Sequence, residues 1–257
     1  MRRRPNGLEQ TRQSIRGERT PGDAALFGPA FDLDAESARV RAELQTYRDA
    51  GRRLFATSSF QTNSVVLLHL LSLHAPETPV YFLDTGYHFP ETHAFRQALA
   101  ARLGLDIRPL ASPVPRIQQR DADGRLLFTS DPDRCCHLNK VLPLDPVIAT
   151  HDVWISGIRG SQSANRAGMG RRAAGRHGIE RYHPLIDWDG RMVHAWLEQH
   201  DLPRHPLDDE GYLSIGCAPC TRRLADDPGI GGLDDRGGRW AGLRKTECGL
   251  HLPGGGA

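Results

Sequence analysis

The residues of this chain whose types and spacing could do chemistry are its five cysteines. Cys135 and Cys136 are adjacent, and Cys217 and Cys220 form a Cys-x-x-Cys pair about eighty residues later. Cys248 stands alone near the C-terminus. A thiolate serves either as a metal ligand or as a nucleophile. Four clustered thiols and one isolated thiol therefore predict two roles: the clustered group is held, and Cys248 reacts.

The adjacency of Cys135 and Cys136 bears on the kind of metal. A structural zinc gathers four sulfurs at one centre, and its cysteine pairs usually leave at least two residues between the ligands. An iron–sulfur cluster offers separate iron corners, so adjacent side chains that point in different directions can each reach one. The spacing favours a [4Fe–4S] cluster, with zinc, disulfides or unligated buried thiols as alternatives.

The segment around Cys248, residues 245–251, reads Lys-Thr-Glu-Cys-Gly-Leu-His. Cationic neighbours such as Lys245 stabilise a thiolate, whereas Glu247 acts against it. We expect a nucleophile on a mobile tail, which enters a pocket to attack and leaves it to present its adduct to a reducing partner. The alternative is an ordinary surface thiol.

Composition narrows the class of protein. The chain has 257 residues, 39% of them hydrophobic, and a net charge of +2, so it favours neither nucleic acid nor a membrane surface as a partner. No apolar run approaches the ~18 residues of a membrane helix. We expect a cytoplasmic protein, because clustered cysteines in a reducing compartment more often bind metal or react than form disulfides.

Apolar periodicity predicts how these residues are positioned. Short apolar runs alternate with helical patterns, which indicates an α/β fold: a parallel twisted sheet with helices on both faces. The expected strands are 54–57, 79–83, 105–110, 152–156 and 182–186, and the expected helices are 33–50, 65–73, 91–103 and 192–200. Residues 1–24 are expected to be disordered, 25–225 to form one nucleotide-binding domain with the metal site, and 226–257 to be a flexible tail.

Ligands of parallel sheets bind at the carboxyl ends of the strands. Three such ends carry Ser-, Thr-, Gly- or Arg-rich loops, at 58–64, 83–92 and 157–166. Backbone N–H groups at a helix N-terminus and arginine side chains both bind phosphate. The loops are consistent with a phosphate-bearing ligand, although 58–64 is not a Walker loop. An ordinary capped helix start and a plain turn are the alternatives.

Taken together, these motifs resemble the assimilatory adenosine 5′-phosphosulfate (APS) reductases. Those enzymes are relatives of the 3′-phosphoadenosine 5′-phosphosulfate (PAPS) reductases, in the adenine nucleotide α-hydrolase-like superfamily. The most specific matches are the four clustered cysteines and residues 245–251, with support from Gly157-Ile158-Arg159 and Gly238-Arg239-Trp240.

The resemblance implies a thioredoxin-dependent reduction of APS to sulfite and AMP, through an S-sulfocysteine on Cys248. The reductant would be thioredoxin or a glutaredoxin-like protein, and a homo-oligomer is possible in such a family. The four cysteines would hold a [4Fe–4S] cluster, and Lys140 would lie between cluster and substrate. The implied substrate-binding residues are Ser58, Ser59, Phe60, Leu83, Thr85, Gly86, Lys140, Arg159, Arg166, Arg236 and Arg239.

Three other interpretations stay open at this point. The first is a PAPS reductase or an enzyme that accepts both nucleotides, although the PAPS-specific branch generally lacks the cluster cysteines. The second is an ATP-using sulfur-transfer enzyme acting on tRNA, whose SGGxDS-type loop this sequence lacks. The third is a non-enzymatic binding module stabilised by zinc on the four cysteines.

Overall fold

The computed structural model describes residues 32–226, 238–240, 245 and 247–250. Its centre is a six-stranded sheet in the order β3-β2-β1-β4-β6-β5, in which every pair is parallel except β5 with β6. The strands are β1 (Leu54–Thr57), β2 (Val80–Asp84), β3 (Ile107–Ala111), β4 (Val153–Ser156), β5 (Arg172–Ala174) and β6 (Glu180–Tyr182). The predicted α/β fold is confirmed, with an antiparallel strand added at one edge.

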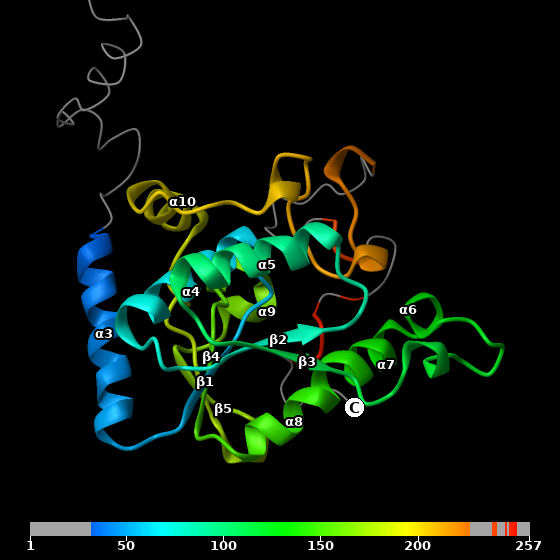
Figure 1. The fold of residues 1–257 in the computed structure, drawn as a ribbon, viewed down its shortest axis with the longest axis horizontal. Helices are drawn as coiled ribbons and strands as arrows, with labels where there is room; N and C mark the ends of the chain where they lie inside the picture. The colour runs from blue at the N-terminus through cyan, green and yellow to red at the C-terminus, as the bar shows by residue number, and fades with distance from the viewer. Residues whose placement is uncertain (1–31, 227–237, 241–244, 246, 251–257) are drawn as a thin grey trace, which may run out of the picture.

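Helices cover both faces of the sheet (Figure 1). On one face lie α3 (Leu33–Asp49), α4 (Thr62–His74), α5 (Pro90–Leu103) and α10 (Gly190–Gln199), and on the other lies α8 (Leu142–Ala149). Successive strand residues point to opposite faces, so Phe82 belongs to the first core and its neighbours Tyr81 and Leu83 to the second. The central strands β1, β2 and β4 are therefore buried on both faces, as is usual in parallel sheets.

The edge of the sheet differs from the sequence prediction. The last parallel strand is Glu180–Tyr182, not 182–186, because Pro184 has no N–H to donate to a neighbouring strand. The strand also contains Arg181, which is buried with its guanidinium 4.9 Å from the centre of the Trp154 ring. Because Arg181 interrupts the apolar pattern, the sequence does not indicate a buried strand at residues 180–182. The predicted strand was therefore placed two residues too late.

The segment that carries the cysteine doublet is helical. It comprises α6 (Leu127–Ser130), α7 (Pro132–Cys136), a π-helix (His137–Val141) and α8, none of which the periodicity predicted. The Asp131 carboxylate caps α7 by accepting from the backbone N–H of Arg134. Asp131 and Pro132 thus fix where α7 begins, four residues before the doublet is complete.

Several sequence predictions fall outside the described residues. They are the disorder of residues 1–24, most of the flexible tail at 226–257, and the position of Arg236. Within the part of the chain that is described, no helix has both the length and the hydropathy needed to cross a bilayer.

Candidate active site

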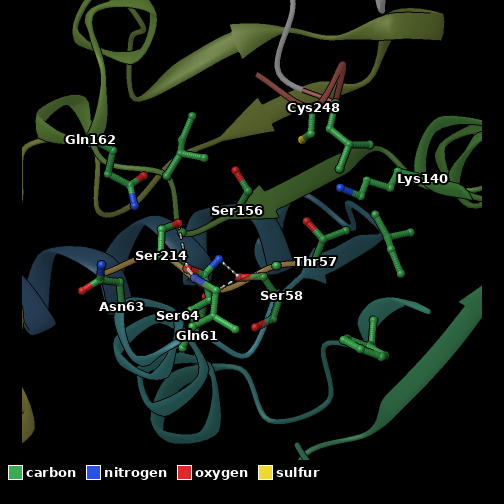
Figure 2. Close-up of a pocket in the computed structure, with 18 of the residues that line it drawn as sticks. Thr57, Ser58, Gln61, Asn63, Ser64, Lys140, Ser156, Gln162, Ser214 and Cys248 are labelled. Atoms are coloured by element: carbon green, nitrogen blue, oxygen red, sulfur yellow. Dashed lines mark hydrogen bonds between the residues drawn. The ribbon is translucent and has the colours of Figure 1, made fainter. Parts of the chain in front are cut away.

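A large cavity opens where the parallel strands end. The space within it is ≈ 1180 Å³ with the open mouth included. Figure 2 shows Cys248 and Lys140 on one side of this cavity, and Ser58, Gln61 and Ser64 on the other. The lining also includes Ser156 at the end of β4. The sheet therefore gathers polar groups from distant parts of the sequence at one edge, as its topology predicts.

The loop between β1 and α4 supplies one wall of the cavity. Ser58 and Ser59 line it, and the Ser58 hydroxyl accepts a hydrogen bond from the backbone N–H of Phe60 at 3.1 Å. Phe60 itself has a φ of 56° and is fully buried, with its ring 5.6 Å from that of Phe82. Phe60 therefore acts as an apolar anchor that turns the loop, and its side chain does not face the cavity.

No side chain among the described residues caps the N-terminus of α4. The first turn of this helix contains no acidic residue either, so its dipole and free N–H groups are available to an anion at the cavity wall. The predicted anion-binding character of residues 58–64 thus has a physical basis in the structure.

Gln61 joins this loop to the segment that carries Cys217. Its Oε1 accepts hydrogen bonds from the backbone N–H of Ile215 at 2.9 Å and from the Ser214 hydroxyl at 3.3 Å. Thr62 makes a second connection, since its hydroxyl donates to Asp208 and accepts from the backbone N–H of His205. Chain segments that are about 150 residues apart in sequence are therefore held together at the cavity wall.

Lys140 connects the main cavity to a smaller one. It lies in the π-helix and, like Cys217 and Arg239, lines both cavities. Burial lowers the pKa of Lys140, but the thiolates of Cys136, Cys217 and Cys248 together outweigh that effect and raise it. The ammonium group is therefore charged, and it lies between the clustered thiols and the isolated one.

The four clustered cysteines all line the smaller cavity, where the space is ≈ 380 Å³ with the open mouth included. Burial raises the pKa of the Cys135 thiol to about 12, and the neighbouring thiols add to the rise. Burial likewise raises the pKa of Cys136 and Cys220. Desolvated thiols such as Cys135, Cys136 and Cys220 become thiolates more readily when a cationic centre compensates their charge. The chemistry of this donor set fits a thiolate-ligated metal group.

The described residues do not fit a single metal ion. No three of their His, Cys, Asp or Glu side chains converge closely enough to hold one. In a tetrahedral zinc site the sulfurs would lie about 3.8 Å apart around one centre. The four clustered thiols line the smaller cavity from two separate chain segments.

Polar side chains hold two of the clustered cysteines in place. The Thr85 hydroxyl lies 3.2 Å from Cys217 Sγ, and the backbone N–H of Ala218 donates to the Tyr87 carbonyl at 2.7 Å. On the other side the Asn139 side-chain amide donates to the Cys135 carbonyl at 2.9 Å. Thr85 therefore supports the smaller cavity and does not line the larger one, although the sequence placed it with the substrate.

The two arginines of the 157–166 loop, which follows β4, lie in different surroundings. Arg159 is fully buried and lies outside the lining of the main cavity. Arg166 lines that cavity from α9 (Ala164–Ala167), and its guanidinium pairs with Glu247 at 3.0 Å. Arg239 lines both cavities and donates to the Ile215 carbonyl at 3.2 Å.

Of the predicted substrate residues, those found in the lining of the main cavity are Ser58, Ser59, Leu83, Lys140, Arg166 and Arg239. Gly86 is not among the lining residues, and its carbonyl accepts a hydrogen bond from Arg116. Sequence reasoning missed Ser156, His88 and Ser214, which line the cavity as well. Ser156 and His88 carried a usable signal, because Ser156 ends a predicted strand and His88 lies in the 83–92 loop, whereas Ser214 carried none.

Fold and cavity together define an α/β protein with a ligand site at its strand ends and a cysteine in the wall of that site. The chain belongs to the phosphoadenosine phosphosulfate reductase family, whose domain model matches residues 53–223. An adenosine 5′-phosphosulfate reductase of Streptomyces coelicolor is 40% identical over 243 residues, which cover 93% of this chain and 99% of the relative. A phosphoadenosine 5′-phosphosulfate reductase of Gloeobacter violaceus is 39% identical over 211 residues, 80% of this chain and 86% of the relative.

A solved structure shows the same fold. The phosphoadenylyl-sulfate reductase of Candida auris, in a phosphate complex, aligns with a TM-score of 0.60 at 25% sequence identity. The alignment covers 70% of this chain and 88% of that one. The resemblance inferred from the cysteine motifs is thus confirmed at the level of the family.

Proposed function

We propose that this chain is an oxidoreductase that reduces adenosine 5′-phosphosulfate to sulfite and AMP, for sulfate assimilation and cysteine biosynthesis. Family membership and relatives named for this activity support the reaction class. The observation that carries the proposal is the position of Cys248, which lines the same cavity as Lys140 and the Ser58–Ser64 loop. A thiol, the cationic side chains of Lys140, Arg166 and Arg239, and an uncapped helix N-terminus thereby share one site.

The substrate brings a phosphate, a sulfate and an adenosine. The phosphate lies against the N-terminus of α4 and the hydroxyls of Ser58 and Ser59, where free N–H groups and the helix dipole stabilise negative charge. The sulfate lies toward Lys140 and Arg239, which neutralise charge as it develops on the leaving phosphate oxygen. Leu83 and Ile158 supply apolar surface for the adenosine.

In the chemical step, the Cys248 thiolate attacks the sulfur of the sulfate group. A bond forms between Sγ and that sulfur, and the bond from the sulfur to the bridging phosphate oxygen breaks. The electron pair of the broken bond leaves on AMP, and Cys248 becomes an S-sulfocysteine. No external electron enters in this step.

A dithiol protein such as thioredoxin or a glutaredoxin-like protein completes the reaction. One of its thiolates attacks Cys248 Sγ and releases sulfite, which takes the electron pair of the S–S bond. Its second thiolate then opens the mixed disulfide and regenerates Cys248. The two electrons needed for the reduction thus come from the dithiol.

Cys135, Cys136, Cys217 and Cys220 would hold a [4Fe–4S] cluster in the smaller cavity. When bound, the cluster would supply a charged centre that keeps its cysteine ligands deprotonated and holds the two chain segments that carry them together. Lys140, which lines both cavities, then orients the sulfate toward Cys248. The hydroxyl of Thr85 and the amide of Asn139 hold the ligand segments in place.

A reductase that acts on the 3′-phosphorylated nucleotide is the second candidate. It is favoured by the similarity to the Gloeobacter violaceus and Candida auris proteins, which are named for that activity. The four clustered cysteines favour the first candidate. The two differ only in whether the enzyme holds or rejects one additional phosphate.

A sulfite-release assay with thioredoxin and each nucleotide in turn tests the proposal. We expect a much higher kcat/KM with adenosine 5′-phosphosulfate, and loss of sulfite release in Cys248→Ser. Equal or higher kcat/KM with the 3′-phosphorylated nucleotide would favour the second candidate. Sulfite release by Cys248→Ser at the wild-type rate would refute the mechanism.

A further inference from the structure

A buried ion pair holds the segment that carries Cys248. The guanidinium of Arg166 donates from Nε to Glu247 Oε2 at 3.0 Å and from Nη2 to Glu247 Oε1 at 3.2 Å. The side chains are 7% and 1% exposed, and the residues are 81 apart in sequence. A bidentate pair of this kind has fixed geometry and is not screened by solvent.

The same carboxylate fixes the backbone of the cysteine. The N–H of Cys248 donates to Glu247 Oε1 at 3.0 Å. On the other side of the pair, Arg166 Nη1 donates to Gln162 Oε1 at 2.5 Å, and that oxygen also accepts from the backbone N–H of Arg159. A continuous chain of hydrogen bonds therefore runs from the loop after β4 to the amide of Cys248.

Apolar contacts reinforce this connection. Leu250 packs against the buried core between the sheet and α8. Gly249 has a φ of 77°, which lets the chain turn between the cysteine and that contact. Glu247 and Leu250 thus hold the segment from both sides of Cys248, while Cys248 itself is only half-buried in the cavity wall.

We infer that Glu247 and Arg166 are positioning residues that keep Cys248 in the cavity, and that Arg166 is committed to Glu247 and not to the substrate. This inference rests on the proposed role of Cys248. The bidentate edge of the guanidinium is already occupied by a carboxylate, so Lys140 and Arg239 are left to meet the sulfate. The assignment replaces the substrate-binding role that the sequence suggested for Arg166.

Removal of one member would leave the other buried without its bidentate partner, which is strongly unfavourable. The segment relieves that cost by moving out of the cavity, which exposes the remaining charge to water. Cys248 then becomes more accessible to solutes and less often placed for attack. The pair therefore controls the balance between the two positions of the cysteine that the reaction needs.

The test is the alkylation rate of Cys248 in the iron-loaded full-length protein, with iodoacetamide as the probe and mass spectrometry of the Cys248 peptide as the readout. We expect Glu247→Gln and Arg166→Met each to raise the alkylation rate about tenfold. The double variant should react no faster than either single variant, because both substitutions remove the same interaction. Arg166→Lys keeps the charge but loses the bidentate contact, so we expect a smaller increase in the alkylation rate. This variant replaces Arg166→Met if the latter folds poorly.

A second ion pair of the same segment provides the matched control. Lys245 pairs with Asp133. The Lys245 side chain is 7% exposed and its ammonium lies 5.7 Å from the centre of the Trp240 ring, whereas the Asp133 side chain is 75% exposed, so removal of this hydrated carboxylate costs little. Asp133→Asn is therefore expected to leave the alkylation rate of Cys248 unchanged. Unchanged rates in Glu247→Gln and Arg166→Met, or additive effects in the double variant, would overturn the inference.

Steady-state kinetics separates this inference from the proposed function. We expect Arg166→Lys and Glu247→Gln to lower kcat for sulfite release with the KM for the nucleotide unchanged. A large rise in KM with an unchanged alkylation rate would assign Arg166 to the substrate and overturn the inference alone. The alkylation readout needs no turnover, so it stands even if Cys248→Ser still releases sulfite.

Discussion

Lys140 and Cys248 line one cavity although they come from distant parts of the sequence, and the thiolate of Cys248 is among the charges that raise the pKa of Lys140. Lys140 also lines the cavity of the four clustered cysteines. A single ammonium group therefore connects the thiol proposed to react with the thiols proposed to hold a cluster.

Lys140→Met removes this charge with little change in volume. Because removal of one group that stabilises developing charge typically costs about 100-fold or more in rate, we expect kcat/KM for sulfite release to fall about 100-fold. Arg134→Met is the matched control, since Arg134 is exposed on the same helical segment and lines neither cavity. Equal losses in the two variants would mean that the effect is not electrostatic stabilisation at the site.

Gly216→Ala tests the position of Arg239. A Cβ at residue 216 would overlap the guanidinium of Arg239, so that side chain must leave its place between the two cavities. We expect a reduced kcat/KM like that of Arg239→Ala, with little further loss when the two changes are combined. Measurement of kcat/KM for both single variants and the double variant checks this. Additive losses would show that the two changes act separately.

Thr62→Val tests the polar connection between α4 and the 205–208 turn. The change leaves the backbone N–H of His205 without its partner and leaves Asp208 only its 3.6 Å ion pair with half-exposed Arg204, so we expect a loss of about 1–3 kcal/mol in the free energy of unfolding. Urea unfolding measures the loss. Thr46→Val, at an exposed position on α3, is the control and should change stability by less than about 0.5 kcal/mol.

Two buried histidines predict how stability depends on pH. Burial lowers the pKa of His183 to about 3 and that of His205 to about 4, from an ordinary value of 6.5. Below pH 6.5 the unfolded chain therefore binds more protons than the folded one, so stability is complete above that pH and falls as the pH decreases toward about 4.

Urea unfolding at several pH values measures this dependence. Each histidine changes the free energy of unfolding by at most about 1.4 kcal/mol per pH unit. His183→Asn should flatten the slope, whereas His194→Asn, at an exposed position on α10, should leave it as it is. An unchanged slope in His183→Asn would contradict the assignment of His183 as a buried neutral group.

Metal content tests the smaller cavity. Protein purified without oxygen should be brown, with about four iron and four sulfide ions per chain, and Cys135→Ser should lose most of both. Thr85→Val should keep the iron but shift the reduction potential, because one hydrogen bond to a ligand sulfur is lost. A colourless protein with about one zinc per chain would contradict the cluster.

The alternation of strands and helices was predictable from the sequence because buried parallel strands such as Val153–Ser156 are continuous apolar runs. The strand at Glu180–Tyr182 was not, because it buries Arg181 against Trp154 in a contact that exists only after folding. The helices around Cys135 and Cys136 were missed for a similar reason. Their short turns are fixed by Asp131 and by the Asn139–Gln119 pair, and not by any apolar period.

The site was predictable where residue chemistry alone is informative. The cysteines and Lys140 could be singled out, and the structure places Lys140 with both groups of thiols. Arg166 and Phe60 show the limit of such reasoning. A motif places Arg166 near an anion, but only the fold shows that a carboxylate of this same chain already occupies it. Phe60 turns the loop from inside the core and does not reach the cavity.

The most direct test of the central claim is to trap the intermediate on Cys248. The protein is mixed with adenosine 5′-phosphosulfate that carries a radioactive sulfur, in the absence of any dithiol, and the peptides are separated at low temperature. We predict about one label per chain on the Cys248 peptide, released as sulfite when thioredoxin is added, and none in Cys248→Ser. Sulfite formation with no label on Cys248 would contradict the account.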